Sequence, residues 1–179
     1  MTDMALKGSL GEQMRRRPAA LAALVIFIGS GATILGAWYF QYVLGLAPCE
    51  LCLEERLPYH IVIPLALLMA IAALVGAPRA LIKVGFAAIL IAMLCSAALG
   101  AYHAGVEWHF WPGPTECTGT LGDFKAGALI DQLRSTHVVR CDEAAWRFLG
   151  LSLAGYNVLV SLALAAVAAF GLAARRDAI

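Results

Sequence analysis

The sequence predicts an all-α membrane protein, a bundle of four transmembrane helices, and three observations predict it. Of the 179 residues, 61% are hydrophobic and only 14% are charged. The hydrophobic residues gather into long runs, four of which contain no Asp, Glu, Lys or Arg. Each run reaches the roughly 20 residues that a helix needs to cross about 30 Å of hydrocarbon. The runs cover residues 19–40, 57–78, 84–106 and 148–174, and the whole chain, 1–179, is expected to form a single integral membrane domain.

Transmembrane strands fit these runs poorly. Strands of a membrane barrel are about ten residues long and alternate apolar with polar side chains, whereas these runs are apolar on every face. The first run follows three arginines, as a secretory signal would, but a signal core covers only about 7–15 residues. This run continues through bulky Trp38, Tyr39 and Phe40. It is therefore expected to remain as the first helix.

The distribution of Lys and Arg predicts the orientation. Eight of them flank the inner ends of the helices and five lie in the two outer loops, residues 41–56 and 107–147. With the acidic residues included, the inner side carries a net charge of +5 and the outer side −4. Both termini are therefore expected in the cytoplasm. Nucleic-acid binding is not expected, because the basic residues form no stripe interleaved with aromatic side chains.

The longer outer loop contains apolar residues at helical spacing between Leu121 and Leu133. This pattern predicts a short interfacial helix lying in the plane of the membrane surface. The alternative is a helix that packs on the outer end of the bundle. Either would hold the loop close to the membrane.

Five cysteines are distributed in a pattern that suggests redox chemistry. Cys49 and Cys52 lie in the first outer loop, Cys117 and Cys141 in the second, and Cys95 inside the third run. An oxidising outer compartment and two cysteines per loop fit one disulfide in each loop. Cys95, which lies mid-helix among apolar residues, is expected to pack as a small hydrophobe.

Cys49 and Cys52 form a C-x-x-C motif, a spacing that lowers the pKa of the leading thiol in many oxidoreductases. The motif directly precedes the second predicted helix, whose amino terminus favours a thiolate. Arg56 follows Cys52 by one helical turn and would add a permanent positive charge beside the sulfur. Alternatively, Arg56 anchors the helix at the membrane interface, or it forms a weak surface ion pair with one of the three neighbouring acids.

Zinc is the main competing chemistry for four outer cysteines. Structural zinc sites commonly use two C-x-x-C knuckles, and only one pair here has that spacing. Cys117 and Cys141 lie 24 positions apart, which suits a disulfide that closes a loop and can be reopened by exchange with a thiol partner. No metal is therefore expected.

Electrons taken from thiols need an acceptor, and the sequence contains no dinucleotide-binding, phosphate-binding or haem-attachment motif. A transmembrane haem is disfavoured because no histidine lies at mid-helix depth. These absences favour a lipid-soluble quinone. His60, His103 and Arg56 could converge at the outer mouth of the bundle and donate to its carbonyl oxygens. For His103, an interfacial position satisfied by water is the alternative.

Three motifs together carry a family resemblance. They are P-C-E-L-C-L-E-E-R at residues 48–56; Tyr102-His103 followed by W-P-G-P at 111–114 and Cys117; and Cys141-Asp142, Trp146 and F-L-G-L at 148–151. In identity, order and placement relative to four helices, the chain resembles the bacterial inner-membrane disulfide bond formation protein B (DsbB) family.

The resemblance implies a thiol:quinone oxidoreductase of the bacterial inner membrane, with its cysteine loops in the periplasm. It would reoxidise a soluble periplasmic dithiol oxidase, DsbA or a relative, and reduce ubiquinone or menaquinone. On this hypothesis the partner's thiolate attacks Cys117 and releases Cys141. Cys141 then engages Cys49, and the freed Cys52 thiolate passes two electrons to the quinone.

The resemblance also implies a binding role for two further residues. Arg56 would stabilise the Cys52 thiolate and the reduced quinone, and His103 matches a position near the quinone. Two rival interpretations remain open. One is the vitamin K epoxide reductase-like class, which usually carries its C-x-x-C near a late helix. The other is a non-enzymatic protein whose outer loops are stapled by two disulfides.

Overall fold

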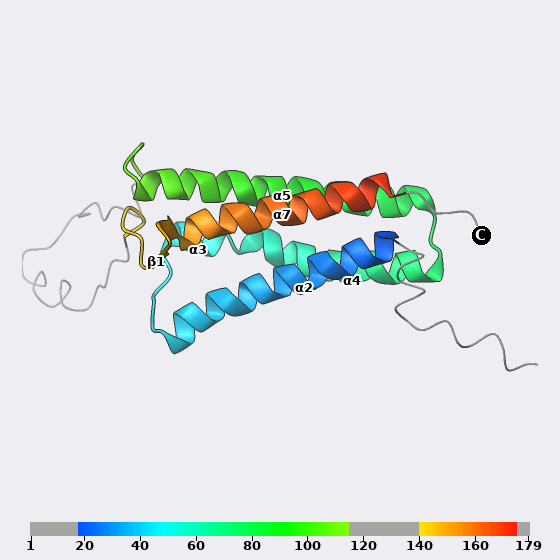
Figure 1. Ribbon diagram of the computed structural model, residues 1–179, viewed down its shortest axis with the longest axis horizontal. Coiled ribbons are helices and arrows are strands. Elements are labelled where there is room, and N and C mark those ends of the chain that lie inside the picture. The colour runs from blue at the N-terminus through cyan, green and yellow to red at the C-terminus, as the bar shows by residue number, and fades with distance from the viewer. Residues whose placement is uncertain (1–17, 115–139, 175–179) are drawn as a thin grey trace, which may run out of the picture.

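Four long helices form the protein, as the sequence predicts (Figure 1). The computed structural model describes residues 18–114 and 140–174. Helix α2 (Pro18–Trp38) continues into a π-helical turn, η1 (Tyr39–Val43), and short α3 (Glu50–Glu54) leads into α4 (Leu57–Val75). Helices α5 (Arg79–Glu107) and α7 (Leu153–Ala173) complete the bundle. Each of the four spans is long and apolar enough to cross a membrane.

The helices run side by side, so the chain reverses direction at each end of the bundle. The tight turn between α4 and α5 lies at the same end as the start of α2 and the end of α7 (Figure 1). That turn uses Gly76, which has a left-handed conformation with φ of 81°, and Pro78, which precedes α5. A residue without a Cβ adopts such a φ at little cost. The opposite end carries α3 and the second loop.

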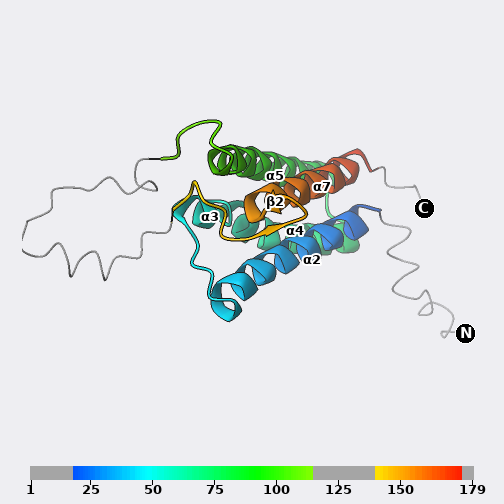
Figure 2. The same cartoon turned by 60° about the vertical axis from the view of Figure 1, so that its left-hand side comes forward.

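At this opposite end, α2 diverges from the other helices (Figures 1 and 2). A two-stranded hairpin of β1 (Arg147–Phe148) and β2 (Leu151–Ser152) also lies here, before α7. Leu149 and Gly150 form its turn and both have positive φ. Ser152 then caps α7, since its Oγ accepts a hydrogen bond from the backbone N–H of Gly155.

The interior of the bundle combines many alanines with a few large side chains such as Phe86 and Ile89, while other large apolar side chains face outwards. Buried residues include Ala23, Ala66 and Ala168, whereas Leu35 and Ile91 are 63% and 62% exposed. Membrane helices associate through small residues that allow close approach, while their outer faces contact lipid. The exposed apolar side chains that would be a liability in water are therefore expected in this protein.

The observed helix ends differ from those of the charge-free runs. Helix α4 begins at Leu57, as the second run does, but the separate short helix α3 precedes it, so the C-x-x-C motif lies at a helix start and not in an extended loop. The fourth helix begins later than the run, at Leu153, because residues 147–152 form the hairpin. Cys95 is exposed on the surface of α5, so it is not part of the buried core. The predicted interfacial helix falls outside the described residues.

Close helix packing yields a stability prediction at Gly171 of α7. A Cβ at this position would overlap the ring of Phe86 on α5, which is fully buried and cannot move aside easily. Gly171→Ala should destabilise the protein by about 1–3 kcal/mol, the usual cost of overpacking. Thermal unfolding in detergent would measure the change. Gly31→Ala is the matched control, because a Cβ added there would meet no atom within 4 Å; equal melting temperatures for the two variants would contradict the packing argument.

Candidate redox-active site

Two free thiols lie together at the start of α3. The Sγ atoms of Cys49 and Cys52 are 3.2 Å apart and hydrogen-bonded. Cys49 caps the helix, and its Sγ accepts a hydrogen bond of 3.4 Å from the backbone N–H of Cys52. One helical turn separates the two residues, so a small movement would bring the sulfurs to disulfide distance. The pair can therefore give up two electrons by closing into a disulfide.

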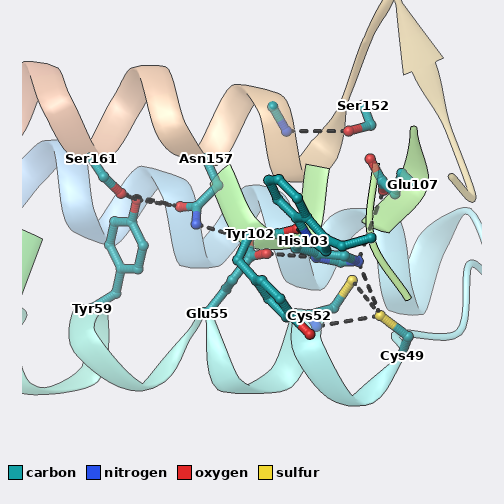
Figure 3. Close-up of polar contacts among 12 residues, drawn as sticks. Cys49, Cys52, Glu55, Tyr59, Tyr102, His103, Glu107, Ser152, Asn157 and Ser161 are labelled. Carbon is teal, nitrogen blue, oxygen red and sulfur yellow. Dashed lines mark hydrogen bonds and ion pairs between the residues drawn. The ribbon is translucent and has the colours of Figure 1, made fainter. Parts of the chain in front are cut away.

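An imidazole from α5 lies against the leading thiol (Figure 3). His103 is 1% exposed, and its Nε2 is 3.6 Å from Cys49 Sγ. Its Nδ1 is 2.6 Å from Oε1 of Glu55, at the end of α3. With Nδ1 paired to this carboxyl oxygen, Nε2 is the ring nitrogen that faces the thiol and can exchange a proton with it. Cys49, His103 and Glu55 are thus arranged as a nucleophile, a base and an orienting carboxylate.

The surroundings of Cys49 favour its thiolate. The hydrogen bond from the Cys52 thiol lowers the pKa of Cys49 most. Burial raises this pKa, and the hydrogen bond from His103 lowers it. Together they lower the pKa of Cys49 from 9.0 to about 4. At neutral pH the reduced site therefore holds a nucleophilic sulfur.

A buried polar network continues from Glu55 towards the middle of the bundle (Figure 3). Asn157 of α7 donates a hydrogen bond of 2.8 Å to Oε2 of Glu55. The hydroxyl of Tyr59, on α4, donates to Oδ1 of Asn157 over 2.6 Å. That hydroxyl also lies 2.8 Å from Ser161 Oγ, which bonds Ser96 of α5. The network thus satisfies polar groups that lipid could not, and it joins α4, α5 and α7.

A cavity of about 250 Å³ lies where α2 diverges from α4 and α7. Its walls are mostly apolar, and its polar lining includes Cys52, Glu55, Arg56, Tyr59 and Asn157. Such an apolar space with a few polar groups is typical of a site for a small hydrophobic ligand. One thiol of the pair is therefore in direct contact with a candidate ligand site.

The predicted site residues divide into two sets around this cavity. Cys52 and Arg56 line it, whereas Cys49 and His103 are not among its lining residues. Arg56 donates a hydrogen bond of 2.6 Å from NH1 to Oε1 of Gln41, so its observed partner is neutral and not one of the neighbouring acids. His60 is exposed and does not line the cavity.

The second loop reaches the site through Cys141. This residue is 1% exposed and disulfide-bonded, and it packs in a small buried cluster with Cys49, Leu51 and Val106. Cys117, the partner that the sequence predicts, lies outside the described residues. A four-cysteine zinc site is not formed, because Cys141 is engaged in a disulfide. Ligand atoms of Cys49, Cys52 and His103 do lie within 4.8 Å of one another.

The sequence alone does not reveal Glu55, Asn157 and Tyr59 as parts of this site. Glu55 belongs to the same motif as the cysteines, but the motif suggests for it only an ion pair with Arg56. Asn157 and Tyr59 lie inside apolar runs, where a single polar residue has no visible partner. The one available signal is the position of Glu55, three residues after Cys52 and hence on the same helical face.

The low pKa of Cys49 can be measured directly. In the form with reduced Cys49 and Cys52 and a closed Cys141 disulfide, ultraviolet absorbance of the thiolate should persist as the pH falls and vanish near pH 4. Because folding lowers this pKa, ionisation stabilises the folded reduced protein fully above pH 9.0 and not below about pH 4. Cys49→Ser should remove the signal. A midpoint near that of an ordinary thiol would contradict the observed hydrogen bonding.

Comparison with known proteins gives one consistent match. Residues 19–171 match the family model of disulfide bond formation protein DsbB. Disulfide bond formation protein B of Saccharophagus degradans is 33% identical, with 81% of this chain and 87% of the relative covered. The protein of that name in Aromatoleum aromaticum is 30% identical over 88% of this chain and 96% of its own. The chain therefore belongs to the DsbB family of disulfide bond formation proteins.

Proposed function

We propose that this protein is a thiol:quinone oxidoreductase that reoxidises a periplasmic DsbA-like dithiol oxidase and so generates disulfides. The observation that carries the proposal is the position of the Cys49/Cys52 dithiol, with one thiol on the wall of an apolar cavity. A quinone accepts two electrons and two protons, which is what a dithiol releases on closing. Ubiquinone and menaquinone are both suitable acceptors.

The cavity fits a quinone ring in size and in lining. Its volume of about 250 Å³ and its apolar walls suit a flat hydrophobic head group. The guanidinium of Arg56 and the amide of Asn157 supply hydrogen-bond donors for carbonyl oxygens. Arg56 is therefore proposed to bind the quinone, and its charge favours the reduced form. His103 is proposed to act on Cys49 and not by direct contact with the ring.

The disulfide of Cys141 supports a relay from the second loop to this dithiol. Cys141 packs beside Cys49, so a thiolate released there needs little movement to reach the other pair. In the proposed sequence the partner attacks Cys117, and the free Cys141 attacks Cys49 when the latter is in its disulfide. Cys52 is then released at the cavity wall. The partner's second thiol next attacks its mixed disulfide and releases Cys117, and Cys117 re-forms its disulfide with Cys141 and frees Cys49. Two electrons have then moved from the partner to the Cys49/Cys52 dithiol.

The direction of electron flow follows from redox potentials. A DsbA-type oxidase has a potential of about −120 mV, so ordinary disulfides, whose potentials are lower, cannot reoxidise it. A quinone pool can accept its electrons.

We further propose that the protein is a single integral domain of the bacterial inner membrane, with both termini in the cytoplasm and the cysteine loops in the periplasm. The excess of basic residues at the inner helix ends supports this orientation.

Cys52→Ser tests the proposed reaction. Purified protein supplied with quinone and a reduced DsbA-like partner should oxidise the partner, and the variant should lose quinone reduction because no disulfide can close. Quinone absorbance measures the loss. Cys95→Ser is the matched control, since Cys95 is a free thiol away from the site. Quinone reduction at the wild-type rate by Cys52→Ser would refute the proposal.

Arg56→Met tests the proposed binding role. Removal of the guanidinium from the cavity should raise the quinone KM at least tenfold, because one charged hydrogen bond contributes about 1.5–3 kcal/mol. Steady-state kinetics over a range of quinone concentrations would measure it, with thermal unfolding as a check on folding. An unchanged KM would remove Arg56 from the quinone site.

A further inference from the structure

The two thiols of the dithiol differ in their access to the cavity. Cys52 lines it, whereas Cys49 is 5% exposed and is not among the lining residues. A quinone gains two protons when the dithiol closes. One is the proton of the Cys52 thiol, and the other is the proton that Cys49 gives up in becoming a thiolate. Cys52 can give its proton directly to a ligand in the cavity. The proton of Cys49 needs another path.

Besides the contact with Cys52, which has its own proton to give, a second hydrogen-bonded path leads from Cys49 to the cavity wall among the described residues. Nε2 of His103 is 3.6 Å from Cys49 Sγ, and Nδ1 is 2.6 Å from Glu55 Oε1. Glu55 lines the cavity, although His103 does not. A proton taken up at Nε2 and released from Nδ1 thus reaches a carboxylate that faces the ligand site.

We propose that His103 and Glu55 form an internal proton relay that carries the Cys49 proton to the quinone. The inference rests on the proposed function and assigns Glu55 a role in it. In the balanced reaction, the Cys49 and Cys52 thiols form one S–S bond and lose two electrons and two protons. The quinone gains both electrons, one proton from Cys52 and one through His103 and Glu55, and leaves as the hydroquinone.

Hydrogen bonds from neighbouring side chains fix the orientation of the Glu55 carboxylate. Asn157 Nδ2 donates to Glu55 Oε2 over 2.8 Å and is itself fixed by the Tyr59 hydroxyl. This bond orients the carboxylate between the imidazole and the cavity. Glu107 is the competing acceptor on the other side of the ring, but its Oε1 is 3.9 Å from Nε2, beyond hydrogen-bond distance. The geometry thus favours transfer towards the cavity.

Glu55→Gln is the decisive variant, because glutamine keeps the shape and the acceptor oxygen but cannot take up a proton. Glu54→Gln is the matched control, since Glu54 is the adjacent residue of α3 and is exposed. Glu55→Asp tests rescue by a carboxylate. Three quantities are measured: single-turnover quinone reduction, reduction of the Cys49–Cys52 disulfide by a small dithiol without quinone, and the pH midpoint of the Cys49 thiolate in quinone-free protein.

The relay predicts that Glu55→Gln slows quinone reduction about a hundredfold, the usual contribution of a positioned proton-transfer group. Reduction of the disulfide should stay within about threefold of wild type, and the thiolate midpoint should rise. Glu55→Asp should recover most of the rate, and Glu54→Gln should behave as wild type.

Two results would overturn the relay while wild-type protein reduces quinone. One is normal quinone reduction by Glu55→Gln, above all if Glu107→Gln is the slow variant instead. The other is that Glu55→Gln slows quinone reduction and reduction of the Cys49–Cys52 disulfide equally. That result would show that Glu55 only maintains the structure of the site. A wild-type protein that reduces no quinone would instead refute the proposed function. In that case, comparing the pH midpoint of the Cys49 thiolate between wild type and Glu55→Gln would still test whether Glu55 acts on Cys49 through His103.

Discussion

The hydrogen bond between His103 and Glu55 is the interaction on which the site depends. It joins α5 to the end of α3 in a region where neither side chain can turn to water, since they are 1% and 7% exposed. Removing either partner would leave a buried polar or charged group without its counterpart, which is among the costliest changes a protein can undergo. Asn157 extends the same constraint to α7. The imidazole ring is consequently held at a fixed angle to Cys49.

This fixed geometry gives the two sulfurs different properties although they lie only 3.2 Å apart. Cys49 is buried beside the imidazole and the Cys141 cluster, and Cys52 faces the cavity. Thiol exchange and electron transfer to a ligand need different surroundings, the first a nearby disulfide and the second an apolar contact. Because one sulfur lies in each environment, a single turn of helix connects the place suited to thiol exchange with the place suited to electron transfer. Both thiols are free in this structure, whereas the sequence predicts a disulfide in each outer loop, so the first loop holds the open pair.

Hydropathy is sufficient to predict the four helices, because the cost of burying charge in lipid limits where a span can lie. It does not predict the helix ends, since these are set by backbone hydrogen bonds: α3 is helical despite Glu50 and Glu54, and the hairpin delays α7. The motif draws attention to Cys52 and Arg56, and both residues line the cavity. It does not reveal the burial of Glu55, because a carboxylate next to other acids is usually on the surface. Only the position of His103 shows that this one is buried.

The end of α2 and the exit from the second loop meet at an aromatic contact. The ring centroids of Phe40 and Trp146 are 5.0 Å apart, and Phe40 and Ala145 both line the cavity. Cys141 lies only five positions before Trp146. Only a short length of chain therefore connects the disulfide to the cavity rim, so a displacement of Cys141 would be transmitted to the aromatic contact between Trp146 and Phe40.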